Sequence, residues 1–276
     1  MKRSLFLWLL AMACALAVGP FCALATPLTL PFGDSQIYWP GYDNTDKDYW
    51  PGWDNDLDTI GIPDFTGGTV ELNDDYELET IVLNLLSWET EPAWSILAPG
   101  DLFLDVDQDE LWDYVVYNPN SKLPMNGNTR GTPEISNSWD VYALPQTLSY
   151  SYEMSGTDNS GYWSGYLIRD DHPIGVIWES SIPEPVGTVN FDGWGTTTLT
   201  FNFTSPLALP LVNNQYALTL GFTVNCANDV LYETVSWDAP PHHITPEPAS
   251  MLLMGSGLVS LAGFMRLRSR RKGQKT

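Results

Sequence analysis

Hydrophobic and polar residues alternate along much of the chain, which is the pattern of half-buried β-strands. In TTTLTFNFT (196–204), for example, Leu199, Phe201 and Phe203 fall on one face. ETIVLNLLSW (79–88) is a longer apolar run without a period near 3.6, so it predicts a strand buried on both faces rather than a helix. The other predicted strands are short and flanked by turn residues: 69–72, 101–106, 112–117, 139–143, 162–169, 174–179, 216–224 and 230–237.

These strands predict an all-β fold. About nine or ten short strands separated by Gly, Pro, Asn and Asp are typical of an antiparallel β-sandwich, here of jelly-roll type. Residues 26–239 are enough for one such domain. The stretch 118–138 is a long loop within it, and residues 240–248 form a linker.

Residues 1–25 have the three parts of a secretory signal peptide. Lys2 and Arg3 precede an apolar stretch, 5–18, and the small residues of 23–25 form an A-x-A cleavage site. We expect cleavage directly after this site. The alternative is an uncleaved N-terminal membrane helix.

A second apolar segment, residues 249–265, predicts a transmembrane helix near the other end. Its 17 residues carry no charge and would span about 26 Å as a helix, a little less than the ~30 Å hydrocarbon core of a bilayer. Residues 266–276 hold six basic side chains, which the positive-inside rule keeps in the cytoplasm. The domain is therefore expected on the far side of the membrane.

Pro246-Glu247-Pro248, the apolar segment and the basic cluster follow one another in a specific order, and residues 246–272 resemble the PEP-CTERM sorting signal of Gram-negative bacteria. The resemblance implies that an exosortase-type membrane protease recognises the tail and cuts near the Pro-Glu-Pro. The product would then reach the cell surface or an exopolysaccharide matrix. The same tripeptide at 183–185 lacks the two parts that follow it, so the tripeptide alone identifies nothing.

The charge between the two ends is strongly negative. Residues 26–245 hold four basic and 33 acidic side chains, a formal charge of −29. Such a surface repels nucleic acid and anionic lipid and attracts cations, and its self-repulsion would be relieved by bound divalent ions. We therefore expect no nucleic-acid partner. The alternative for the acidity itself is that it serves solubility alone.

The segment LFLDVDQDELWDYVVY (102–117) is the candidate metal site. Carboxylates and one carbonyl occupy alternate positions of a loop between two strands: Asp105, Asp107, Asp109, Leu111 (through its carbonyl) and Asp113. Ca²⁺ accepts six to eight oxygens at ~2.3–2.6 Å, and alternate oxygens on a tight loop converge on one point. The loop therefore predicts bound Ca²⁺, against the alternative of a solvated acidic turn.

The spacing of these residues resembles the D-x-D-x-D-G-x-x-D hairpin loop of FG-GAP repeats and integrin α propellers, which implies Ca²⁺ held between two strands. Glu110 stands where that pattern has Gly, so the turn must strain a side-chain residue or change shape. The motif occurs once, which implies no propeller. An EF-hand fits less well, because Val116 would replace its bidentate carboxylate.

One local repeat supplies candidate ligand-binding residues. YWPGYDN (38–44) recurs as YWPGWDN (49–55). Trp39, Trp50 and Trp53 are the candidate platform for carbohydrate, because an aromatic face matches the apolar face of a sugar ring. The alternative is that these side chains pack one end of the core.

RDDHP (169–173) is the candidate for catalysis. His172 beside Asp170 could act as a general base, but no nucleophile elbow, Cys-His pair or zinc spacing accompanies it. The alternative is a turn stabilised by contacts among these side chains.

We therefore predict an exported, non-catalytic, Ca²⁺-binding protein that associates with extracellular polysaccharide. A surface polysaccharide hydrolase and a purely structural coat protein are the other two functions that fit the sequence.

Overall fold

The structure is a computed structural model of the chain. It describes residues 27–42, 63–86, 97–119, 136–155, 162–163, 166–167, 172–179, 181–225, 227, 229–238 and 255–256. The chain divides into two compact units, Ala25–Ala239 and a second unit made of Met1–Leu24 and Pro240–Thr276. The predicted signal peptide and Pro-Glu-Pro motif lie outside the described residues, as does all of the predicted transmembrane helix except 255–256. No helix within the described ranges has the length and apolar character of a membrane span.

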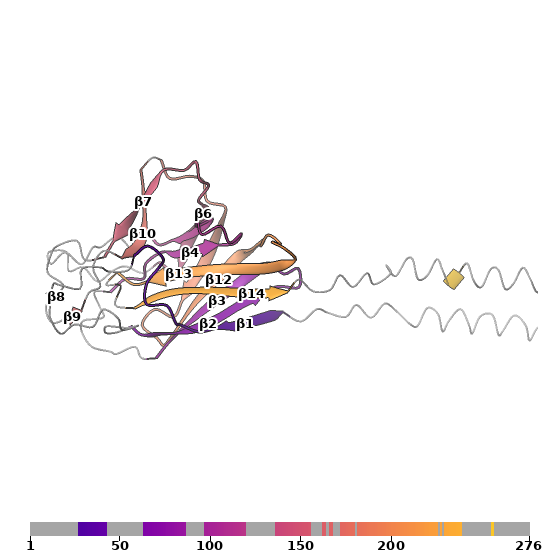
Figure 1. Cartoon of the computed structure of the whole chain (residues 1–276), viewed down its shortest axis with the longest axis horizontal. Coiled ribbons are helices and arrows are strands. Elements are labelled where there is room, and N and C mark those ends of the chain that lie inside the picture. Colours follow the sequence, from indigo (N-terminus) through magenta and orange to yellow (C-terminus); the bar gives the residue numbers. More distant parts are fainter. Residues whose placement is uncertain are drawn as a thin grey trace, which may run out of the picture. The chain divides into compact units, whose positions relative to one another are not determined.

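The unit Ala25–Ala239 is built from β-strands (Figure 1). Ten of them form one antiparallel sheet in the order β1-β2-β3-β12-β11-β6-β5-β4-β13-β14. Their bounds are β1 Leu28–Phe32, β2 Phe65–Leu72, β3 Leu78–Leu85, β4 Leu102–Asp105, β5 Tyr114–Tyr117, β6 Ser138–Ala143, β11 Gly187–Asp192, β12 Thr198–Leu207, β13 Gln215–Thr223 and β14 Val230–Asp238. Two further pairs stand apart from this sheet: β7 (Tyr150–Met154) with β10 (Pro173–Trp178), and β8 (Tyr162–Trp163) with β9 (Tyr166–Leu167).

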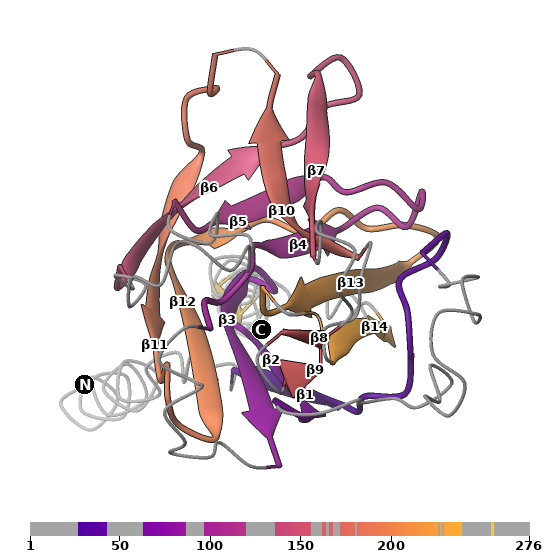
Figure 2. The same ribbon diagram turned by 90° about the vertical axis from the view of Figure 1, so that its left-hand side faces the viewer.

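The large sheet curls until its first and last strands meet. Figure 2 looks along the domain and shows the strands following one another around a nearly closed path, with β1 against β14. Two carboxylates reinforce this approach: Asp229 Oδ2 accepts from the backbone N–H of Phe65, and Glu233 Oε1 accepts from Ser35 N and Oγ, both at 2.8 Å. The all-β prediction is confirmed, whereas the jelly-roll sandwich is wrong. Alternation fixes the face on which each side chain lies, but it does not fix which strands pair.

Two glycines in β2 permit the curl. Gly67 has φ = +97° and lies where the register between β2 and β3 shifts. A Cβ on Gly67 would lie 2.1 Å from the carbonyl oxygen of Phe32, and a Cβ on Gly68 would lie 1.8 Å from that of Val82. Bulges of this kind bend a strand and increase its twist. The two glycines therefore let β1, β2 and β3 approach closely while the sheet turns.

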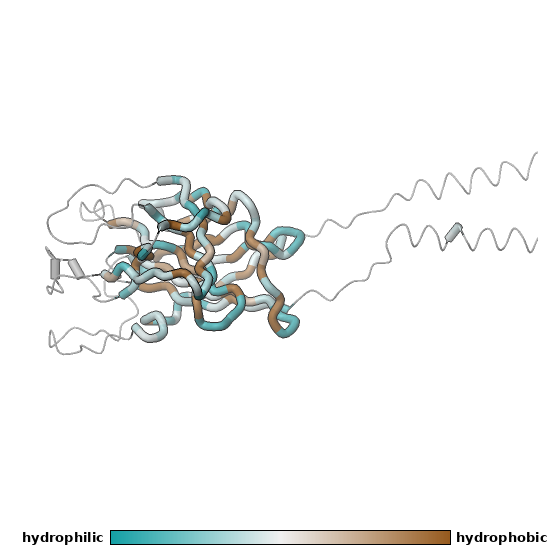
Figure 3. Tube along the Cα trace, turned by 90° about the horizontal axis from the view of Figure 1, so that it is seen from above, coloured by the Kyte–Doolittle hydropathy of each residue, from teal (hydrophilic) through white to brown (hydrophobic). Residues whose placement is uncertain are grey.

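One face of each strand points into the curl and forms the main core. Its largest side chains are aromatic, and Trp139 and Phe191 stack with their ring centroids 4.3 Å apart. In Figure 3 the hydrophobic stretches follow the strands and the hydrophilic stretches follow the turns. The strand predicted at 79–88 is confirmed as β3, but it is not buried on both faces: Glu79 and Asn84 are exposed.

A second, smaller core covers the outer face of β4, β5 and β6. Phe103 and Val115 point outward here and pack with Ile174 and Val176 of β10. Asp101 fastens this layer, because it is completely buried and both of its oxygens are used. Its Oδ1 accepts from Asn118 N at 2.7 Å and its Oδ2 from Val176 N at 2.8 Å. The β7–β10 ribbon is thus held against the sheet by apolar contacts and by a buried carboxylate.

Candidate functional site

The acidic loop lies between β4 and β5, two neighbouring antiparallel strands of the sheet. Asp105 ends β4 and is 3 % exposed, whereas Asp107 and Asp109 are exposed. One oxygen of each of these three carboxylates lies within 4.8 Å of the other two. Hard cations such as Ca²⁺ are bound by carboxylate oxygens gathered in this way.

Hydrogen bonds from the backbone hold the loop in its tight shape. Asp105 Oδ1 accepts from Gln108 N at 2.7 Å, and Asp109 Oδ1 accepts from Leu111 N at 2.9 Å. Gln108 and Glu110 have φ = +64° and +67°. Glu110 therefore adopts the left-handed conformation in which the resembled pattern has Gly, at the cost of strain for a residue with a side chain.

Asp113 lies beside the three converging carboxylates but is also used by the loop itself. Its Oδ2 accepts from Val106 N at 2.7 Å. Burial raises the pKa of the Asp113 carboxyl, and the negative charges of Asp107 and Asp109 raise it further. The carboxylates of the loop therefore repel one another, and a bound cation would reduce this repulsion. Leu111 is 49 % exposed at the loop tip.

The ionised form of Asp105 is also disfavoured by its surroundings. Burial raises the pKa of its carboxyl, the N–H of Gln108 lowers it, and the charge of Asp113 raises it. No described residue of the domain is Lys or Arg, since Lys47, Lys122, Arg130 and Arg169 all lie outside the described ranges. The described part of the chain therefore offers these carboxylates no cationic side chain.

Trp39 is not a surface platform for sugars. It is 2 % exposed, and its ring packs edge-on against Phe103 and Trp112 at centroid distances of 5.2 and 5.3 Å. Its indole N–H donates to the carbonyl of Leu231 in β14 at 3.0 Å. The indole is a core side chain that joins the segment after β1 to the sheet. The other two tryptophans of the predicted platform, Trp50 and Trp53, lie outside the described residues.

His172 is also part of the packing. It is 1 % exposed, Trp39 N donates to its Nε2 at 3.5 Å, and its Nδ1 lies 3.1 Å from the carbonyl oxygen of Pro173. A ring that accepts at Nε2 and donates at Nδ1 is neutral. A buried imidazole with both nitrogens used is not placed to act on a substrate in solution, and Asp170 lies outside the described residues.

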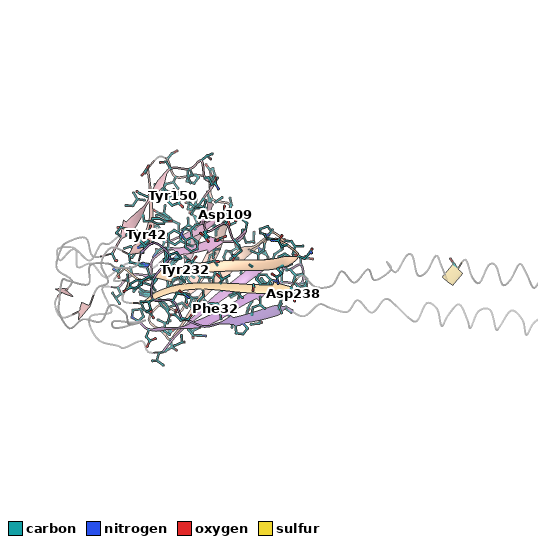
Figure 4. All side chains as sticks on the ribbon, in the orientation of Figure 1. Phe32, Tyr42, Asp109, Tyr150, Tyr232 and Asp238 are labelled. Atoms are coloured by element: carbon teal, nitrogen blue, oxygen red, sulfur yellow. The ribbon has the colours of Figure 1, made fainter. Side chains whose placement is uncertain are left out.

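Six half-buried aromatic side chains pack against the outer core, and one of them is Trp178. The other five will be called the aromatic surface: Tyr42, Trp112, Tyr150, Tyr152 and Tyr232. They come from the segment after β1, the acidic loop, β7 and β14. Phe103 lies beneath them, with its ring centroid 5.5 Å from that of Trp112 and 5.9 Å from that of Tyr152. In Figure 4, Tyr42, Tyr150 and Tyr232 lie toward the same end of the domain, away from Asp238 at the end of β14.

A glycine in β13, Gly221, leaves room for two of the indole rings. A Cβ on Gly221 would lie 2.7 Å from Cη2 of Trp112 and 2.9 Å from Cζ2 of Trp39. Glycine is therefore required at this position if both indoles are to rest on the strand. Trp112 in turn contacts Tyr232, with ring centroids 5.9 Å apart.

Hydrogen bonds link three members of the aromatic surface, Trp112 with Tyr152 and Tyr152 with Tyr150. Burial is the largest cause that raises the pKa of Tyr152. The hydrogen bond to Tyr150 raises this pKa further, and the hydrogen bond from the Trp112 indole lowers it. The hydrogen bond between the two tyrosines lowers the pKa of Tyr150. Because an indole N–H can only donate, the Tyr152 hydroxyl accepts from Trp112.

Little in the sequence predicts the aromatic surface. Its members are far apart in the chain and are brought together by β4, β7, β13 and β14. One local signal exists: Tyr150 and Tyr152 alternate with Ser151 and Glu153, which is a strand pattern with aromatic residues on one face.

Comparisons with known proteins concern the tail alone. Residues 245–271 match the family model of the PEP-CTERM protein-sorting motif. No curated protein and no solved structure matches the chain. The resemblance predicted over 246–272 is thereby confirmed, and the motif marks the chain as an exported protein that an exosortase, a membrane protein, sorts to the cell surface after transient anchoring at its C-terminus.

Proposed function

We propose that this chain is a non-catalytic surface or matrix protein whose exported β-domain binds Ca²⁺ and associates with carbohydrate. The observation that carries the proposal is the sorting motif at 245–271. The domain that precedes this motif is strongly acidic and exposes carboxylates and aromatic rings on its described surface. Export places that surface in contact with extracellular cations and polysaccharides.

The chain contains its own control for the sorting step. We expect replacement of Pro246-Glu247-Pro248 by three alanines to prevent tail removal and to retain the protein in the membrane fraction. The same replacement at Pro183-Glu184-Pro185, in the connection between β10 and β11, should leave sorting unchanged. Equal release of both variants to the surface would contradict the proposal.

Ca²⁺ binding is proposed at the acidic loop. Asp105, Asp107 and Asp109 already gather one oxygen each within 4.8 Å. The carboxylate of Asp113 and the carbonyl of Leu111 complete the proposed ligand set. Burial and mutual repulsion raise the pKa of both Asp105 and Asp113, and a divalent cation would remove that repulsion.

Thermal unfolding tests the Ca²⁺ proposal. A ligand that binds only the folded state at one hundred times its Kd adds about 2.7 kcal/mol, which for a domain of this size raises Tm by about 5–10 °C. We expect this rise on adding Ca²⁺ to chelator-treated protein, and its loss in Asp107→Asn. Asp75→Asn, in the acidic turn between β2 and β3, is the control. An unchanged Tm with Ca²⁺ and with chelator would exclude the metal.

Carbohydrate association is proposed at the aromatic surface. Half-buried tyrosine and tryptophan rings combine an apolar face with a polar edge, which suits stacking against sugar rings. Trp50 and Trp53 remain part of this proposal, although Trp39 does not. Binding of the protein to a panel of purified polysaccharides tests it directly. No binding to any of them would contradict the association.

A further inference from the structure

The described domain surface has an unusual charge composition, because it presents carboxylates and no cationic side chain. No Lys or Arg lies in the described part of residues 26–245, and His172, the one described histidine, is 1 % exposed. A carboxylated, sulfated or phosphorylated ligand would find no positive partner there and would be repelled by the formal charge of −29. The complementary ligand is a cation.

The rings of the aromatic surface stand nearly at right angles to one another. The angle between ring planes is 88° for Tyr42 and Tyr152, 85° for Tyr150 and Tyr152, and 69° for Trp112 and Tyr232. Their centroids are 6.0, 5.8 and 5.9 Å apart. Edge-to-face contacts of this kind gather the rings in one small area, where each half-buried ring keeps part of its surface exposed. An ammonium group is attracted to the face of an aromatic ring when it lies within about 6 Å of the centroid.

Negative charge lies beside these rings. The carboxylates of Asp105 and Glu110 act on the Tyr232 hydroxyl and add to the effect of burial in raising its pKa. At the other end of the surface, the hydroxyl groups of Tyr150 and Tyr152 are hydrogen-bonded to each other. A ligand here meets apolar rings, tyrosine hydroxyls and carboxylate acceptors.

We infer that the aromatic surface binds an oligosaccharide or polysaccharide of amino sugars whose free amines are protonated. The inference rests on the proposed carbohydrate association and names its chemical class. The sugar ring supplies an apolar face for stacking, and each ammonium supplies the positive charge that the π-faces and the carboxylates attract. A neutral sugar lacks the second interaction, and an acidic sugar reverses its sign.

Competition among short oligosaccharides tests the ligand class. The full chain is kept in a detergent without a sugar headgroup, and chelator is present so that the result is independent of the Ca²⁺ proposal. Oligomers of glucosamine, N-acetylglucosamine and glucose are titrated at mildly acidic pH, where the amines are protonated. We expect the glucosamine oligomer to bind at least tenfold more tightly than the other two, and added salt to reduce that preference by screening. Equal or tighter binding of the acetylated or neutral oligomers would overturn the inference while leaving carbohydrate association intact. No binding by any oligomer would overturn both.

Substitutions test the location. Tyr232→Leu and Tyr150→Leu keep apolar volume but remove a ring, and each should weaken glucosamine-oligomer binding about tenfold. Tyr216→Leu is the matched control. Tyr216 is also half-buried, but it lies near the start of β13, where it pairs with Trp237 of β14. Tyr150→Phe, which removes only the hydroxyl, covers the case in which a leucine variant fails to fold. An equal effect of all the substitutions, or no effect of any in folded protein, would place the ligand elsewhere and overturn the inference.

Discussion

Three polar side chains join parts of this domain that lie far apart in the chain. Asp101 connects residues 118 and 176, Asp229 reaches β2, and the Trp39 indole reaches β14. Each is buried, so each hydrogen bond replaces one that water would otherwise supply. None of the three is marked by local sequence, because a lone buried Asp or Trp has no motif. The converging carboxylates at 105–109 differ in this respect, since their spacing alone points to a common centre.

Glu110 offers a prediction about backbone strain. Its φ of +67° is costly for a residue with a side chain but not for glycine. We expect Glu110→Gly to stabilise the domain by about 0.5–1 kcal/mol, because the relieved strain exceeds the extra freedom of the unfolded chain. Denaturant unfolding measures the difference.

Gln108 is the control for this prediction, since its φ is +64°. Its side chain also donates to Thr219 Oγ1 at 3.0 Å, so Gln108→Gly loses a hydrogen bond and should gain less. A destabilised Glu110→Gly variant would show that the side chain contributes more than its backbone costs.

The raised pKa of Tyr142 predicts how folding stability changes at alkaline pH. Burial, followed by the charge of Asp140 and a hydrogen bond to it, raises the pKa of Tyr142 to about 12 from an ordinary value of 10.0. Between these values the unfolded chain releases this proton and the folded chain keeps it, so folding stability falls as the pH rises from 10 to 12. Below pH 10 this group has no effect.

Tyr142→Phe keeps the ring and removes the ionisable hydroxyl. We expect this variant to lose less stability over the same alkaline range, as measured by urea unfolding at a series of pH values. The same slope in both proteins would show that Tyr142 ionises as freely in the folded state as in the unfolded state.

At the scale of elements, hydrophobic alternation identified most strands but not their arrangement. The strands predicted at 196–204, 216–224 and 230–237 are confirmed as β12, β13 and β14, and the last two pair with each other as an antiparallel hairpin. β1, β7 and β11 were not predicted. β1 contains Pro31, which breaks the usual strand composition and suits an edge strand because it has no N–H to pair. The single curled sheet depends on the bulge at Gly67, whose effect on curvature is not visible as a hydrophobic pattern.

The Trp39 indole is one of the side chains that attach the segment from Gly33 to Tyr42 to β14. Trp39→Phe keeps an aromatic ring in the core but leaves the carbonyl of Leu231 without its 3.0 Å donor. An unpaired buried polar group costs about 1–3 kcal/mol. We expect a loss of this size in urea unfolding, together with faster amide exchange in β14.

Trp237→Phe is the control, because Trp237 is 7 % exposed and its Nε1 has no hydrogen-bond partner among the described residues. This variant loses packing volume but also removes the unpaired N–H, so it should cost less than Trp39→Phe. A cost equal to that of Trp39→Phe would mean that the hydrogen bond to Leu231 adds nothing.

At the scale of the whole molecule, the order of segments carries the functional conclusion. A sorting motif at 245–271 follows an all-β unit whose charge is −29 over residues 26–245. The destination could be predicted from the sequence, because a sorting signal is a contiguous stretch whose parts follow one another in a fixed order. The surface of the domain could not, because the aromatic side chains that form it meet only after the sheet has curled.

The mass of the protein recovered from the surface of producing cells tests the central claim that the chain is exported and sorted. The account predicts a product that begins at Thr26 and ends before residue 249, with the apolar segment and the basic tail removed. A full-length product of 276 residues found in the cytosol would contradict it.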